Sequence, residues 1–131
     1  MPSNIYVIDV SLNPKRKVTF SGTDNVNEIA RDDDEQLIVW RLTGDAASGS
    51  FVAGSFDWIG EKRPPQGSFG RARFGSNGKT MWMFLTNNDD SDSDSKTTGP
   101  WSYGLSIVVD GKVYSSNTGP AHGDDPVIKN N

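Results

Sequence analysis

Apolar and polar residues alternate along much of the chain with a period of two, as in strands that bury one face. Segment 4–10 is rich in β-forming residues, with Ile5, Val7 and Asp9 on one face and Tyr6, Ile8 and Val10 on the other, and segments 36–43 and 80–86 also carry apolar residues on both faces. The pattern predicts strands at 4–10, 17–20, 36–43, 50–59, 68–74, 80–86, 101–109, 112–115 and 126–129, the fourth with a bend at Gly54 that could divide it.

Helical periodicity is weak throughout. Segment 26–35 is the one candidate, and its two apolar residues, Val26 and Ile29, do not form a helical stripe. We expect a short strand or turn there, followed by a solvated acidic loop at 32–35.

The dipeptide Asp110-Gly111 lies between two apolar runs and predicts a two-residue hairpin turn in which both residues take positive φ. In that register Val109 faces Lys112, so Lys112 shares a sheet face with Tyr103, Leu105, Ile107 and Tyr114. If that face covers the core, the Lys112 ammonium lies at its rim.

Many short strands separated by 14 glycines and 7 prolines indicate an all-β fold. We expect one domain, residues 1–131, built as an antiparallel two-sheet β-sandwich of about eight strands. The chain has no cysteine, which excludes disulfides and thiolate chemistry.

Charge and hydropathy exclude two classes of partner. The net charge of −4 disfavours nucleic acid, and the basic run 15–17 is expected to be a solvated turn. No apolar run approaches the ~20 residues of a membrane helix, and no leader is visible, so we expect a cytoplasmic protein. The acidic segment 87–96 lacks the glycine and glutamate of an EF-hand, so we expect a solvated loop and no cofactor or metal, with a weak calcium site of another type as the alternative.

The four tryptophans suggest a second function class. Trp40 and Trp82 lie in strands that are apolar on both faces, so we expect them in the core. Trp58 and Trp101 border loops and are candidates for a carbohydrate-binding platform. The period of two places Phe69, Arg71 and Arg73 on one face of their strand, and we expect the two arginines to face outward.

The C-terminal segment holds the one histidine of the chain and its one Asp-Pro bond. Attack by the Asp125 carboxylate on its own main-chain carbonyl closes a cyclic anhydride as the Pro126 nitrogen leaves. His122 and Asp124 are sequence neighbours that could act as acid or base, and Asp110 could do so if the fold brings it close. A lysine of lowered pKa, such as Lys112, could capture the anhydride as an isopeptide.

The chain also resembles the DP-EP family of small bacterial β-sandwich proteins, the Asp-Pro endopeptidases. The resemblance lies in the layout of four segments, IYVIDV, QLIVWRL, WSYGLSIVVDGKVY and the closing DPVIKN, and so covers most of the length. It implies a chain that cuts itself at an Asp-Pro bond and keeps the released strand in its sheet. It also implies that a lysine can bond to the new Asp terminus and that a further aspartate activates water.

Carried onto this sequence, the resemblance makes Asp125 and Pro126 the scissile pair and 127–131 the retained strand. The aspartate would be Asp110 or Asp124, and the lysine Lys112, with Lys96 and Lys79 as alternatives. We therefore expect a self-cleaving endopeptidase-like protein whose partner is its own segment 126–131, with self-association as a homo-oligomer. The alternative is a non-enzymatic binding or self-assembly sandwich with a carbohydrate or protein partner.

Overall fold

The computed structural model describes residues 4–22, 26–30, 32–59, 64, 69–87, 101–116 and 126–130. These residues form twelve strands, one 3₁₀ turn and no α-helix, which confirms the all-β prediction. The elements are β1 (Ile5–Leu12), β2 (Val18–Phe20), β3 (Val26–Ile29), β4 (Asp32–Leu42), η1 (Gly44–Ala46), β5 (Ser50–Phe51), β6 (Asp57–Trp58), β7 (Arg73–Phe74), β8 (Thr80–Asn87), β9 (Trp101–Gly104), β10 (Ser106–Val109), β11 (Lys112–Ser115) and β12 (Val127–Asn130).

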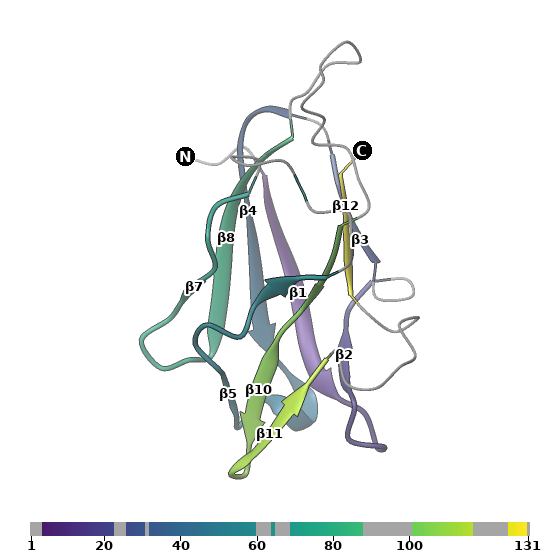
Figure 1. Ribbon diagram of the computed structural model, residues 1–131, viewed down its shortest axis with the longest axis vertical. Helices are drawn as coiled ribbons and strands as arrows, with labels where there is room; N and C mark the ends of the chain where they lie inside the picture. The colour runs from purple at the N-terminus through teal and green to yellow at the C-terminus, as the bar shows by residue number, and fades with distance from the viewer. Residues whose placement is uncertain are drawn as a thin grey trace.

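The largest sheet has five strands in the order β2-β1-β4-β8-β7, and Figure 1 shows its long strands β1, β4 and β8 running along the molecule. The expectation of a purely antiparallel arrangement is wrong, because β1 and β4 pair in parallel. Side-chain alternation has the same period in parallel and antiparallel strands, so the sequence pattern could not distinguish them.

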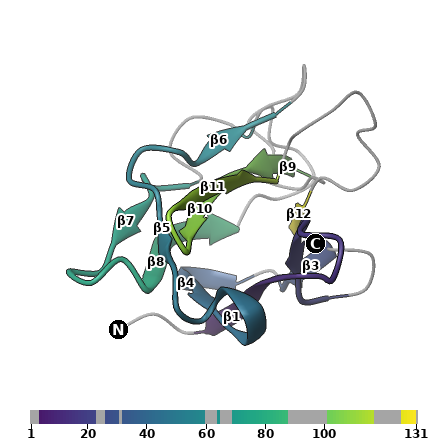
Figure 2. The ribbon, with the colours of Figure 1, turned by 90° about the horizontal axis from the view of Figure 1, so that it is seen from below.

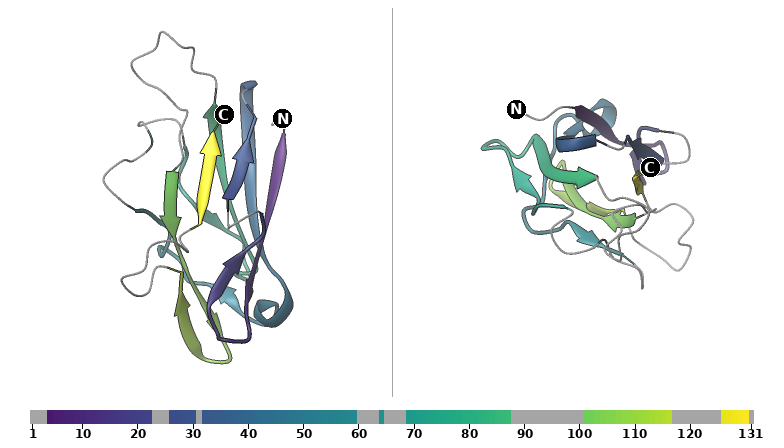
Figure 3. Two further views of the ribbon diagram at one scale, coloured as in Figure 1. Left: turned by 90° about the vertical axis from the view of Figure 1, so that its right-hand side faces the viewer. Right: turned by 90° about the horizontal axis from the view of Figure 1, so that it is seen from above.

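Two smaller sheets complete the fold, with the orders β3-β12-β9-β6 and β11-β10-β5. Only Leu105 separates β9 from β10, and β12 also pairs in parallel with β3. Seen from below, β1 and β4 lie on one side of the molecule and β9, β10 and β11 on the other (Figure 2). Figure 3 shows β12 in yellow beside β3 and the green strand β9.

One hydrophobic cluster fills the interior. Trp40, Tyr103 and Ile128 are fully buried in it, together with side chains from β1, β4, β8 and β10. Trp40 and Tyr103 also pack edge to face, with ring centroids 5.6 Å apart. The core therefore joins the five-stranded sheet to both smaller sheets.

The hairpin prediction is confirmed in detail. Val109 pairs with Lys112 and Ile107 with Tyr114, and the φ angles of Asp110 and Gly111 are 52° and 79°. Ile107 and Val109 are buried, as expected for a core face, but the Lys112 side chain is exposed.

Segment 50–59 forms two short strands, β5 and β6, on either side of Gly54, which is one of the two outcomes that the sequence allowed. Two other expectations need correction. The acidic run Asp32–Glu35 belongs to β4 and is not a loop. Trp82 is not in the core, because it lies on the opposite face of β8 from the buried Met81 and Met83. An apolar strand does not itself reveal which face points inward.

The strand register also changes the faces predicted for segment 68–74. Phe69 pairs with Leu85 and Arg73 with Trp82, so five residues oppose four and the strand carries a bulge. Phe69 packs against the core while Arg73 is exposed, although the period of two had placed them on one face. No helix that the structure describes is long and apolar enough to cross a membrane.

Candidate functional site

Pro126 occupies a buried position at the start of β12. Its carbonyl oxygen accepts a hydrogen bond of 3.1 Å from the backbone N–H of Tyr103. Proline has no N–H of its own, so burial at this point leaves no backbone donor unsatisfied. The C-terminal side of the Asp125–Pro126 bond is thus fixed to the edge of β9.

The strand that follows is held on both sides. Val127 and Ile128 pair with Ser102 and Trp101 of β9, and the whole of β12 pairs with β3. The Ile128 side chain is fully buried, whereas Lys129 faces outward and lies 4.0 Å from the carboxylate of Glu28. β12 is therefore an internal strand of its sheet, tied by a ladder on each edge.

A buried polar pair lies beside this junction. The indole N–H of Trp40 donates a 2.9 Å hydrogen bond to the hydroxyl of Tyr103, whose backbone binds Pro126. Burial raises the pKa of the Tyr103 hydroxyl above its ordinary value of 10.0, and the bond from Trp40 opposes that rise only in part. Tyr103 thus stays neutral over the whole physiological range.

The structure places Asp110 and Lys112 far from Pro126. Both lie at the tip of the β10–β11 hairpin, and the run from Tyr103 to Val109 separates them from the start of β12. At about 3.3 Å per residue this run spans roughly 20 Å. The fold therefore does not bring Asp110 or Lys112 to Pro126, and the exposed Lys112 lacks the burial that the capture chemistry requires.

The other sequence candidates divide into two groups. His122, Asp124 and Asp125 lie outside the described residues, as do Lys96 and the acidic segment 88–96. Lys79 is described, and its ammonium donates to the carbonyl oxygens of Ala47, at 3.2 Å, and Gly49, at 2.5 Å. That amine is occupied at the β5 end of the molecule.

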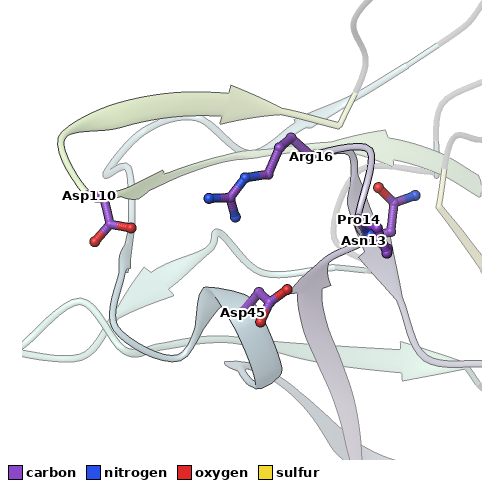
Figure 4. Close-up of a pocket in the computed structure, with 5 residues that line it drawn as sticks. All are labelled: Asn13, Pro14, Arg16, Asp45 and Asp110. Atoms are coloured by element: carbon purple, nitrogen blue, oxygen red, sulfur yellow. The ribbon is translucent and has the colours of Figure 1, made fainter.

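Asp110 instead lines a polar hollow of about 340 Å³ (Figure 4). Asp45 from η1 and Arg16 from the β1–β2 turn also line it, and the Arg16 guanidinium points into the space between the two carboxylates. The lining of this hollow is mostly polar. No group of three or more potential metal ligands occurs within the described ranges. The sequence made Asp110 a catalytic candidate but gave no sign that Arg16 and Asp45 would lie beside it.

A second hollow, of about 280 Å³, opens between β6 and β7. It is walled by aromatic rings, floored by Met83 and bordered by an acidic and a basic residue. The small residues Gly54, Gly70 and Ala72 leave this space open. Its larger lining residues are Phe56, Asp57, Trp58, Arg71, Phe74 and Met83.

Of the two tryptophans predicted to form a binding platform, only Trp58 lies at this hollow. Trp58 is half-buried and packs on Phe56, with ring centroids 5.1 Å apart, while Trp101 is only 8% exposed. The sequence held a signal for this hollow in two separate segments: Phe56 and Trp58 alternate in one, and the small residues Gly70 and Ala72 lie in the other. The prediction from sequence did not bring these two segments together.

Comparison of the chain with models of known protein families gives no match. No curated protein matches its sequence.

Proposed function

We propose that this protein cleaves its own backbone between Asp125 and Pro126 and keeps segment 126–131 bound as a strand, as the resemblance to the DP-EP family implies. The observation that carries the proposal is the placement of Pro126: it is buried, bonded to Tyr103, and followed by a strand paired on both edges. In this proposal the three sheets act as the two layers of one β-sandwich, with β9 and β10 as one bent strand.

The chemistry conserves atoms and charge at each step. The Asp125 carboxylate attacks its own carbonyl carbon, the C–N bond to Pro126 breaks, and the proline nitrogen takes a proton. One water then opens the five-membered anhydride and leaves a free Asp125 terminus. Capture by a lysine amine would instead form an amide, with no net gain or loss of water.

The anchored proline side supports this chemistry in a physical way. Because β12 is fixed by two ladders, movement of this strand would not relieve torsional strain applied to the Asp125–Pro126 bond during cleavage. The departing amine also remains beside β9 after the bond breaks.

The positions of the charged residues limit which of them can act as acid or base in the cleavage. Asp110 and Lys112 lie roughly 20 Å along β9 and β10 from Pro126, so we assign the acid or base role to Asp124 or His122, which adjoin the bond in sequence. Hydrolysis is accordingly the expected outcome, rather than capture by Lys112.

Intact mass spectrometry of the purified chain tests the proposal. Wild-type protein should yield fragments 1–125 and 126–131, whose summed mass exceeds the intact mass by one water. Asp125→Asn should leave the chain intact, because the amide is a poor nucleophile, while the matched Asp45→Asn, an exposed site on η1, should cut as wild type does. Cleavage of the Asp125→Asn chain at the same bond would falsify the anhydride route.

A second candidate is a binding module that takes one ring of a carbohydrate in the hollow between β6 and β7. Its volume of 280 Å³ lies near the lower end of the roughly 300–1,000 Å³ of ligand pockets, which suits a single ring. Aromatic walls match the apolar face of a pyranose, and the rim residues Asp57 and Arg71 match its hydroxyls.

Titration with glucose, galactose and N-acetylglucosamine, followed by the indole N–H resonance of Trp58, tests this candidate. Binding should shift that resonance, and Ala72→Phe should abolish the shift by filling the hollow. An unchanged resonance with all three sugars rules the candidate out.

A further inference from the structure

The outer face of the five-stranded sheet, which points away from the core toward solvent, carries apolar side chains. The register of β1, β4 and β8 aligns six large side chains that point away from the core, and none of them belongs to the core cluster. Ile5 and Val7 are 61% and 48% exposed, and the other four are half-buried. The first row is Ile5, Leu37 and Phe84, and the second row is Val7, Val39 and Trp82.

This arrangement differs from that of an ordinary sheet with one solvated face. Such a face alternates with the core face and carries polar side chains. A contiguous apolar patch on a soluble domain marks a contact surface. Six side chains in two adjacent rows across three neighbouring strands form such a patch, which we call the outer patch.

The outer patch ends in opposite charges on its central strand. Along the outer side of β4 the residues read Glu35, Leu37, Val39 and Arg41, an acid, two apolar residues and a base at spacings of two. Glu35 and Arg41 are both exposed. Arg41 pairs with Asp9 of β1, but a guanidinium has five donors and can bind a second carboxylate.

We propose that the outer patch is the contact with a second copy of this chain, related by a two-fold axis perpendicular to the strands at the level of Ile38. That axis lays β4 antiparallel on β4 of the second copy, so that Leu37 meets Val39 and Glu35 meets Arg41. Each of these contacts occurs twice, as an isologous interface requires. The charge pattern along β4 is thus complementary to itself in this orientation, and a second copy satisfies it.

Geometry sets the strength of this contact. Three strands about 4.8 Å apart and seven residues rising about 3.3 Å each give a footprint of roughly 14 by 23 Å. That is small beside the ~800 Å² per partner of a standard interface, so the dimer is weak and depends on concentration. The two sheets pack face to face about 10 Å apart, with strands near-aligned.

The inference does not rest on self-cleavage. The outer patch belongs to β1, β4 and β8, whereas Pro126 and β12 belong to another sheet. Failure of one proposal therefore leaves the other standing, because mass spectrometry reads the cut and sedimentation reads the association.

Sedimentation velocity over about 10 μM to about 1 mM tests the contact at the strength expected for a small interface. Wild-type protein should shift from monomer toward dimer as its concentration rises. Glu35→Arg should raise the dissociation constant of the dimer about tenfold or more, because arginine then faces arginine. Val113→Arg is the matched control, since Val113 is 64% exposed on β11 and lies off the patch; it should associate like wild type.

Mixing two variants gives the sharpest test. Glu35→Arg and Arg41→Glu should each associate poorly alone, but an equimolar mixture should form the dimer again, because each arginine then faces a glutamate of the other chain. Val7→Lys, which alters the patch without touching the Asp9–Arg41 pair, should also weaken the dimer, with folding of every variant checked by circular dichroism. A monomeric wild type, an unaffected Glu35→Arg or a mixture that does not associate overturns the proposal.

Discussion

Replacing Ile128 by alanine probes the strand on which the account depends. Ile128 is fully buried between β3 and β9 and belongs to the same core cluster as Trp40 and Tyr103. Its position in the core, close to the end of the chain, makes it an anchor for the C-terminal segment.

The magnitude follows from the atoms removed. Ile128→Ala deletes three carbons, worth about 2.4 kcal/mol at ~0.8 kcal/mol each, and the cavity that remains brings the expected loss to about 2–5 kcal/mol. The matched change Val127→Ala affects a half-buried side chain on the other face and should cost less than about 1 kcal/mol.

Urea unfolding followed by tryptophan fluorescence measures both free energies of unfolding, with the slope of each transition checked for two-state behaviour. In self-cleaved protein the same substitution should weaken retention of segment 126–131 about 30-fold or more, seen as peptide lost on gel filtration. Equal losses from Ile128→Ala and Val127→Ala would refute the buried placement of β12.

Three further changes test separate parts of the structure. Tyr103→Phe should cost about 1–3 kcal/mol because the buried indole N–H of Trp40 loses its acceptor. Burial raises the pKa of Tyr103, so the protonated hydroxyl favours the folded state. The free energy of unfolding should therefore hold below about pH 10 and fall as the pH rises above it. Denaturation of the phenylalanine variant over the same pH range should show a smaller fall. Lys112→Ala should leave the cleavage products unchanged by mass spectrometry, and loss of a cross-linked species would contradict its distance from Pro126. Gly111→Ala should lower stability by about 1 kcal/mol through its positive φ alone, since nothing lies within 4 Å of the new methyl; an unchanged melting temperature would be inconsistent with the tight turn.

Local pattern was enough to predict much of this fold. The β10–β11 hairpin was predictable residue by residue, because Asp110-Gly111 specifies the turn and the turn fixes the register. The all-β class and most strand positions followed from alternation and from apolar, β-branched and aromatic runs bounded by turn residues.

The pairing of strands that are distant in the chain could not be predicted from the sequence. The parallel contacts of β1 with β4 and of β12 with β3 join segments distant in the chain, and the period of two is the same for either direction. Trp82 shows a related limit, since an apolar residue on a two-faced apolar strand gives no sign of which side is solvated.

The candidate site divides in the same way. The chemistry proposed for the Asp125–Pro126 bond rests on two adjacent residues, because nucleophile and electrophile belong to one of them, and it stays a prediction. The separation of Asp110 and Lys112 from Pro126 could not be predicted, because it depends on β12 pairing at the start of the long β9–β10 run. The apolar rows of the outer patch likewise required the register of three strands.

Mass measurement of the same sample under native and denaturing conditions tests the central claim most directly. Self-cleavage with a retained strand predicts one native species at the full-chain mass plus one water, which separates on denaturation into fragments 1–125 and 126–131. A single species of unchanged full mass under both conditions, after prolonged incubation, would show that the bond before Pro126 stays whole and would contradict the account.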